Sequence, residues 1–209
     1  MTTGVGRVVE VFADIVCPFA HVGLRRFVEA RRRTGADEVL LRVRAWPLEL
    51  VNGEPLAAAV VAEEIDDLRA QVAGDLFTGF AVESFPTSTI APLALAAVAY
   101  DLGLVTGESV SLALRHTLFE RGRPVGDPEV LAAIAADHVL AVPDPATASA
   151  LVERDLTEGR ERGVIGSPHF FLGDGSWFCP GLGIERRGEH LHIEPTEALF
   201  EEFLTRAFA

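Results

Sequence analysis

The sequence predicts a mixed α/β domain with a helical insertion between its two halves, and three observations support this fold class. The first 46 residues have the pattern of a strand, a helix and a second strand. Residues 56–162 are rich in alanine and leucine at helical spacing. The last quarter of the chain has the pattern of a β-hairpin followed by a helix. The expected order is therefore βαβ, a helical block, and ββα.

The opening βαβ unit follows from local composition. Residues 7–15 alternate and are rich in valine, which predicts a buried strand that ends near Asp14. Pro18 is typical of the first turn of a helix, and Gly35 is typical of the residue that ends one. Residues 39–46 alternate again and predict a second strand. Because βαβ connections are right-handed, we expect these two strands to be parallel.

The helical insertion is divided by glycine and proline into four or five expected helices. Asp127 is a candidate N-cap of one of them, because proline and glutamate follow it directly. Residues 189–194 predict a short strand near the end of the chain. Residues 195–208 predict a closing amphipathic helix. Its expected buried side chains are Ala198, Leu199, Phe203 and Leu204.

Composition excludes several classes of function. The chain of 209 residues has 18 basic and 31 acidic residues, a net charge of −13, which disfavours nucleic acid and anionic membranes as partners. All the basic residues are arginine, so chemistry that depends on lysine is excluded. The amino-terminal residues lack a signal-peptide pattern, and no apolar run is long enough for a membrane helix. We therefore expect a cytoplasmic protein with reactive or simply packed cysteines.

Two motifs carry the candidate chemistry. In residues 13–20 (ADIVCPFA), Cys17 lies at the junction between the first strand and the first helix. The unpaired N–H groups and partial positive charge of a helix start stabilise a thiolate, so this position predicts a reactive cysteine. In residues 163–171 (GVIGSPHFF), Pro168 stands immediately before a predicted strand.

The two motifs, in this order of elements, resemble the DsbA-like branch of the thioredoxin superfamily. Similar proteins include cytosolic predicted dithiol-disulfide isomerases, kappa-class glutathione transferases and hydroxychromene-carboxylate isomerases. The resemblance implies a thioredoxin-like domain of residues 1–55 and 163–209, with an α-helical insertion over residues 56–162. It also implies that Pro168 is a cis-proline facing Cys17, and that Ser167 offers backbone groups to an extended substrate.

One departure from this family pattern bears directly on mechanism. Redox-active members carry a C-x-x-C motif, whereas Ala20 stands at the fourth position here, so the motif cannot form its own disulfide. Cys179 is the internal candidate for a resolving thiol. A turn at residues 173–176 would pair Phe170 with Cys179, about two positions from Pro168, although a slip of one residue would reverse its direction. Ordinary packing in an aromatic strand is the alternative for Cys179.

Further candidate substrate contacts are Pro18, Phe19, His21, His169 and Trp46. His21 lies four residues beyond Cys17 on the same helix face, where its charge could lower the thiol pKa. An exposed surface histidine fits the same pattern. Trp46 ends the second strand near Cys17, with core packing as the alternative. The other histidines show no metal-ligand spacing with the cysteines, so we predict no metal site.

The leading hypothesis is an enzyme, a thiol–disulfide oxidoreductase with Cys17 as the nucleophile. Cys179, a substrate thiol or a low-molecular-weight thiol cosubstrate would resolve the intermediate, and no other cofactor is expected. The substrate would be a small-molecule thiol or disulfide, or a protein disulfide. The alternatives are a kappa-like transferase or isomerase and a non-catalytic binding protein. The helical insertion leaves room for a homodimer interface.

Overall fold

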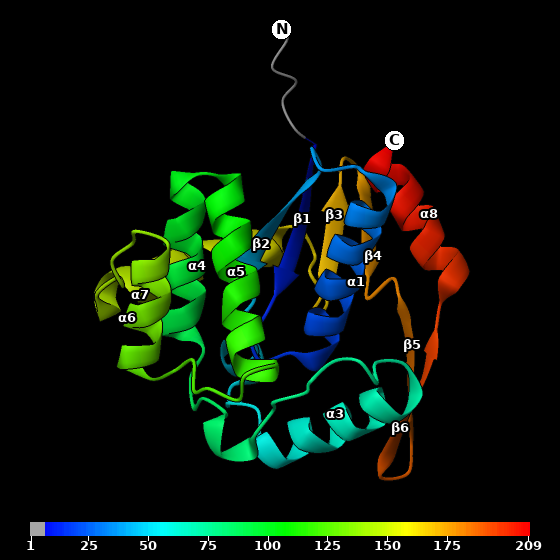
Figure 1. Cartoon of the computed structure of the whole chain (residues 1–209), viewed down its shortest axis with the longest axis horizontal. Coiled ribbons are helices and arrows are strands. Elements are labelled where there is room, and N and C mark those ends of the chain that lie inside the picture. Colours follow the sequence, from blue (N-terminus) through cyan, green and yellow to red (C-terminus); the bar gives the residue numbers. More distant parts are fainter. Residues whose placement is uncertain (1–6) are drawn as a thin grey trace, which may run out of the picture.

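The computed structural model describes residues 7–209 and is built around a four-stranded sheet (Figure 1). The strand order is β2-β1-β3-β4, with β1 and β2 parallel and the other pairs antiparallel. The strands are β1 (Val8–Ala13), β2 (Leu40–Ala45), β3 (His169–Leu172) and β4 (Gly175–Phe178). Helix α1 (Pro18–Thr34) joins β1 to β2 as predicted, and Gly35 ends it in the left-handed conformation. The first six residues of the predicted domain lie outside the described residues.

Alternation along β1 divides the core between the two faces of the sheet. Val9 and Val11 belong to the cluster under α1 and α8 (Glu197–Phe208), whereas Phe12 packs with Trp46 on the opposite face. Helix α8 buries only Phe203 and Ala207 completely, with Phe200 half-buried. The prediction was wrong for Ala198 and Leu199, which are exposed because they lie off this i, i+3, i+7 stripe.

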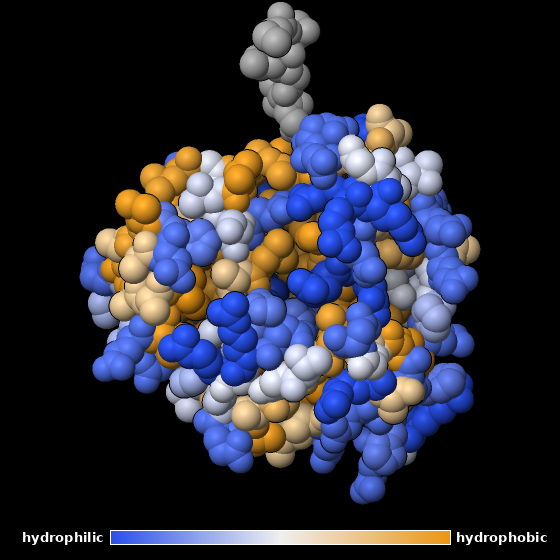
Figure 2. All heavy atoms as spheres, in the orientation of Figure 1, coloured by the Kyte–Doolittle hydropathy of each residue, from blue (hydrophilic) through white to orange (hydrophobic). Residues whose placement is uncertain are grey.

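The segment between β2 and β3 is helical in the structure. Its elements are α2 (Leu48–Asn52), α3 (Ala58–Gln71), η1 (Val82–Ser84), α4 (Ile90–Leu102), α5 (Leu104–Phe119), α6 (Pro128–Asp137) and α7 (Pro145–Glu161). The Asp127 carboxylate accepts hydrogen bonds from Glu129 and Val130, so its predicted role as an N-cap is confirmed. The α4–α5 turn exposes Leu102 and Val105 in an apolar corner (Figure 2). None of the helices within residues 7–209 could cross a bilayer.

The helical insertion covers the outer edge of β2 with polar side chains. Glu108 of α5 accepts a hydrogen bond from the Leu41 N–H at 2.6 Å, and Asp155 of α7 accepts one from the Ala45 N–H at 3.1 Å. Between them, the Tyr100 hydroxyl accepts from the Val43 N–H and donates to the Leu41 carbonyl. An unpaired strand edge is thereby satisfied without another strand, which fixes the insertion against the sheet.

A second hairpin, β5 (Leu182–Arg187) and β6 (His190–Pro195), packs on α3 rather than on the main sheet. The Gln71 side chain donates to the Leu191 carbonyl and accepts from the Ile193 N–H, as a neighbouring strand would. Asp67 accepts from the Leu191 N–H at 2.7 Å. The sequence predicted β6 but not β5, because the mostly exposed residues of β5 lack an apolar face.

Replacing Tyr100 with phenylalanine should destabilise the protein by about 1–3 kcal/mol, because the buried Val43 N–H would lose its acceptor. Urea denaturation followed by circular dichroism measures the free energy of unfolding. Asp101→Asn, at an exposed position of the same helix, is the control and should stay within about 0.5 kcal/mol of the wild type. Equal stability of Tyr100→Phe and the wild type would contradict this role of the hydroxyl.

Candidate thiol site at the cis-proline

Cys17 lies directly before the first helix, where the sequence placed it. It is the N-cap residue of α1, with an extended backbone, and Pro18 occupies the first helical position. Proline suits this position because an N–H there would have no partner within the helix. The Cys17 side chain is buried, and only 3 % of the residue is exposed. Ala20, at the position of the missing second cysteine, is completely buried.

The Ser167–Pro168 peptide bond is cis, and this dipeptide faces Cys17. The Cys17 thiol donates a hydrogen bond to the Ser167 carbonyl at 3.1 Å. The Ser167 hydroxyl accepts a hydrogen bond from the Asp14 N–H at 3.0 Å. The two segments meet because β1 and β3 are adjacent and antiparallel, so the end of β1 lies beside the beginning of β3.

Cys179 also contacts the cis dipeptide, but not from within a strand. Phe170 pairs with Trp177, which corrects the predicted pairing of Phe170 with Cys179. The turn consists of Gly173 and Asp174 only, so β4 ends one residue before Cys179. The Cys179 N–H donates to the Pro168 carbonyl at 3.0 Å, and its φ of 44° is left-handed, which is uncommon for cysteine. The Cys17 thiol and the Cys179 backbone N–H therefore contact successive carbonyls of one cis dipeptide.

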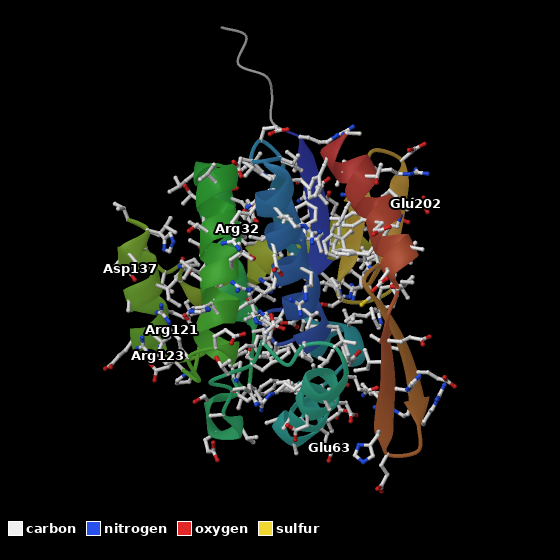
Figure 3. All side chains as sticks on the ribbon, turned by 45° about the vertical axis from the view of Figure 1, so that its right-hand side comes forward. Arg32, Glu63, Arg121, Arg123, Asp137 and Glu202 are labelled. Carbon is white, nitrogen blue, oxygen red and sulfur yellow. The ribbon has the colours of Figure 1, made fainter. Side chains whose placement is uncertain are left out.

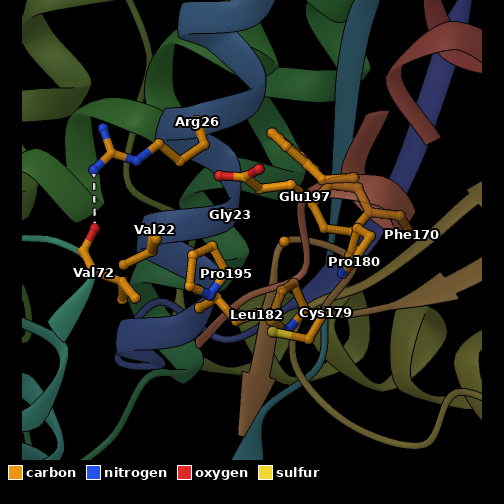
Figure 4. A pocket seen from close by; sticks show the side chains of 13 residues that line it. Val22, Gly23, Arg26, Val72, Phe170, Cys179, Pro180, Leu182, Pro195 and Glu197 are labelled. Atoms are coloured by element: carbon orange, nitrogen blue, oxygen red, sulfur yellow. Dashed lines mark hydrogen bonds between the residues drawn. The ribbon is translucent and has the colours of Figure 1, made fainter. Parts of the chain in front are cut away.

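Cys179 lines a mostly apolar cavity of about 150 Å³ (Figure 4). Its walls come from α1, the cis-proline, the segment after β4, and the start of α8. Arg26 and Glu197 are its charged residues; Arg26 is already bound to Asp75 and to the Val72 carbonyl. Cys17 is not among the lining residues, so its thiol does not face this cavity.

Burial determines the protonation of both cysteines. Burial raises the pKa of Cys17 to about 11, and the carboxylates of Asp14 and Glu64 act in the same direction. Burial raises the pKa of Cys179 to about 12. The helix start was predicted to lower the Cys17 pKa; in this arrangement desolvation is the larger effect, so both thiols are protonated at neutral pH.

Asp14 is a site residue that the sequence analysis did not single out. Its buried carboxylate accepts hydrogen bonds from the N–H groups of Val16 and Leu48 and from the Thr89 hydroxyl. Burial raises the pKa of this carboxyl to about 6. Its position at the end of a buried strand was the available signal in the sequence. Its partners Leu48, after β2, and Thr89, before α4, are too distant in sequence to be predicted.

His21 does not face the thiol, contrary to the prediction that it could hold a charge beside Cys17. Its Nε2 lies 2.7 Å from the Glu120 carboxylate, and its ring packs against Phe77 and Phe119. Burial lowers the pKa of His21, while the hydrogen bond from its ring helps to hold the pKa of Glu120 at about 2. His21 therefore ties α1 to the end of α5.

The other predicted contacts are placed around the site rather than in the cavity. Phe19 is half-buried and packs against both large apolar clusters. His169 is buried against Phe171, and its Nδ1 accepts a hydrogen bond from the Ile165 N–H. Trp46 packs on Phe12, in the core position that was its alternative. No cluster of potential metal ligands occurs within residues 7–209.

The sheet order, the cysteine at the start of α1 and the cis-proline opposite it define a thioredoxin-type fold with an α-helical insertion. The DSBA-like thioredoxin domain model matches residues 8–183. The chain therefore belongs to the DSBA-like thioredoxin domain family. In a comparison with curated proteins, no sequence matches the chain significantly.

Solved structures share the fold at low sequence identity. A probable DsbA oxidoreductase from Streptomyces coelicolor is 23 % identical, with a TM-score of 0.65, over 96 % of this chain and 89 % of that one. A 2-hydroxychromene-2-carboxylate isomerase is 17 % identical, with a TM-score of 0.63, over 95 % of both chains. The cytosolic disulfide reductase DsbM from Pseudomonas aeruginosa is 16 % identical, with a TM-score of 0.56, over 96 % of both chains.

Asp14→Asn should change how stability depends on pH. Because the folded pKa of Asp14 is about 6 and the ordinary value is 3.8, the unfolded chain loses this proton first as pH rises. Asp14 therefore contributes most stability below pH 4, and about 3 kcal/mol of that contribution is lost by pH 7. The wild-type free energy of unfolding minus that of Asp14→Asn should therefore fall by roughly 2.5 kcal/mol between pH 4 and 7.

Urea titrations at several pH values measure this difference. Asp137→Asn, which removes an exposed carboxylate from α6, is the control for the change in charge (Figure 3). A difference between wild type and Asp14→Asn that stays constant or rises with pH would contradict the raised pKa.

Proposed function

We propose that this protein is a thiol–disulfide oxidoreductase in which Cys17 is the only nucleophilic cysteine of its motif. The observation that carries this proposal is the contact of both cysteines with the Ser167–Pro168 cis dipeptide. Ser167 is half-exposed, so its backbone is within reach of an extended substrate. Membership of the DSBA-like family supports the same class of reaction.

In the first step, the Cys17 thiolate attacks one sulfur of a substrate disulfide. A mixed disulfide forms on Cys17, and the other substrate sulfur leaves as a thiolate that takes up a proton. In the second step, a further thiolate attacks the Cys17 sulfur, and the remaining half of the substrate leaves as a thiolate that takes up a proton. The substrate disulfide is reduced to two thiols, and Cys17 and the attacking thiol are oxidised to a new disulfide.

The second thiol must come from outside the motif, because Ala20 replaces the usual cysteine. We propose Cys179 as the resolving thiol in the absence of other thiols, since its backbone N–H binds the carbonyl next to the one that the Cys17 thiol binds, which brings the two residues to the same dipeptide. A low-molecular-weight thiol is the other candidate. One structure of the disulfide reductase DsbM was determined with GSH, which makes glutathione a suitable first thiol to test here.

The raised pKa of Cys17 adds a requirement to this mechanism. The buried thiol is protonated at neutral pH and donates to the Ser167 carbonyl, so attack requires that Cys17 becomes more exposed when substrate binds. The cavity beside Pro168 and Cys179 would then hold an apolar group of the substrate.

The same protonated thiol favours a second candidate function, a kappa-like transferase or isomerase that binds a small thiol near Cys17 without redox turnover. A thiol that donates a hydrogen bond and carries no charge is suited to line a ligand site rather than to attack a disulfide. Fold similarity to the 2-hydroxychromene-2-carboxylate isomerase is compatible with this candidate but does not favour it over the first.

Cys17→Ser should lower the rate of disulfide reduction by roughly 100-fold or more, because a serine hydroxyl does not attack disulfide sulfur. The first release of thiol from oxidised glutathione and from a peptide disulfide, in a single turnover, measures this rate, and Cys179→Ala, which keeps Cys17 and should still release one thiol, is the matched single-cysteine control. Circular dichroism verifies that both variants fold. Retained activity in Cys17→Ser would contradict the proposed nucleophile, and no turnover by the wild type would favour the second candidate.

Cys179→Ala should trap the intermediate when no other thiol is present. After a single addition of a peptide disulfide, this variant should retain a mixed disulfide on Cys17, whereas the wild type should release the peptide and form a Cys17–Cys179 disulfide. Intact-mass spectrometry distinguishes the two products by their masses. A mixed disulfide that persists equally in the wild type would contradict resolution by Cys179 and leave the role to an external thiol.

A further inference from the structure

Arg115 of α5 is an arginine buried in the interior of the molecule. Only 1 % of this residue is exposed, whereas Arg32 and the acidic Glu63 and Glu202 point outwards (Figure 3). Its Nη1 donates to the hydroxyl of Ser111 at 2.7 Å and to the carbonyl of the same residue at 3.1 Å. Its Nε has no hydrogen-bond partner within residues 7–209.

The other end of the guanidinium holds the connection that leads to Cys17. Nη2 donates to the Asp14 carbonyl at 3.0 Å and to the Ala13 carbonyl at 3.5 Å. Ala13 ends β1, Asp14 is the first residue beyond it, and Cys17 lies three residues after Asp14. The Arg115 side chain therefore connects α5 of the helical insertion to the segment that precedes Cys17.

Packing and hydrogen bonding alone do not account for a cation at this place. A buried guanidinium loses its hydration, and neutral carbonyls replace that hydration only in part. No carboxylate within the described part of the chain makes an ion pair with Arg115; the carboxylate of Asp14, which is hydrogen-bonded to Val16, Leu48 and Thr89, acts on the guanidinium through its charge alone. A methionine could fill much of the same volume without this cost, so the charge itself needs an explanation.

A thiolate at Cys17 is an anion that would complement this charge. Burial lowers the pKa of Arg115 to about 10, and the negative charges of Asp14, Tyr100 and Cys17, when these groups are ionised, oppose this in that order, so the guanidinium is charged at neutral pH. Interaction between two charges is reciprocal, so the guanidinium must favour the ionised form of Cys17 to the same extent. The other groups that bear on Cys17 are Asp14 and Glu64, and both oppose its ionisation.

We propose that Arg115 is a positioning residue whose positive charge stabilises the Cys17 thiolate and whose hydrogen bonds hold the β1–α1 connection beneath it. This inference rests on the proposed function in taking Cys17 as the reacting thiol. It assigns to the helical insertion a direct influence on the chemistry of the thioredoxin-like half.

The test is the pH dependence of Cys17 alkylation by iodoacetamide, measured in a Cys179→Ala background so that one thiol reports. Arg115→Met removes the charge, whereas Arg115→Lys keeps a charge but loses the planar guanidinium group. Ser111→Ala keeps the arginine and removes the hydroxyl that accepts one of its hydrogen bonds. In Arg115→Met, we expect the midpoint of the alkylation profile to rise by about one pH unit, with an alkylation rate about tenfold lower at pH 8. Ser111→Ala and Arg115→Lys should remain within about threefold of the parent at that pH.

An unchanged profile in a folded Arg115→Met would overturn the proposal. If this variant does not fold, Arg115→Gln, which removes the charge but keeps a hydrogen-bond donor, takes its place: an upward shift of about one unit supports the role of the charge, and an unchanged profile overturns it. The readout does not require disulfide exchange. Cys17→Ser with retained exchange activity would therefore reject the proposed function and leave this measurement interpretable.

Discussion

The geometry of the thiol site depends on Asp14, the first residue beyond β1. Its N–H binds the Ser167 hydroxyl, its carboxylate binds the Leu48 N–H after β2, and its carbonyl accepts from Arg115 of α5. Three segments that are distant in sequence are thus held at one point, and the chain from that point leads directly to Cys17. The position of the thiol against the cis-proline is a consequence of this convergence, because the connection has no freedom to place Cys17 elsewhere.

The same convergence limits the reactivity of the thiol. Contacts that fix Cys17 also exclude water from it, and desolvation raises its pKa more than the start of α1 lowers it. The arrangement described here is therefore a protonated, resting form of the site. Asp14 and Glu64 oppose a thiolate at Cys17, whereas the charge of Arg115 has the sign that would favour one, so the proposed chemistry depends on the balance between this charge and the burial of Cys17.

Local patterns predicted the elements but not the contacts between them. The strands and helix of the βαβ opening and the N-cap Asp127 follow from spacing within a few residues. Gly173-Asp174-Gly175-Ser176 allows a turn of four residues or of two, and the two-residue choice moved Cys179 out of the strand. His21 was assigned to the thiol because it shares a helix face with Cys17, but the competing carboxylate of Glu120 lies 99 residues away. Such long-range partners have no signal in a single sequence.

Arg115 shows why the missing second cysteine does not by itself argue against chemistry at this site. An apolar residue would satisfy the packing at this place at lower desolvation cost, although the Asp14 carboxylate also interacts with the charge of Arg115. The guanidinium instead lies where its charge opposes the effects of Asp14 and Glu64. Since Ala20 occupies the usual position of the resolving thiol, the stabilisation of Cys17 has to come from outside the motif, and α5 is the element placed to supply it.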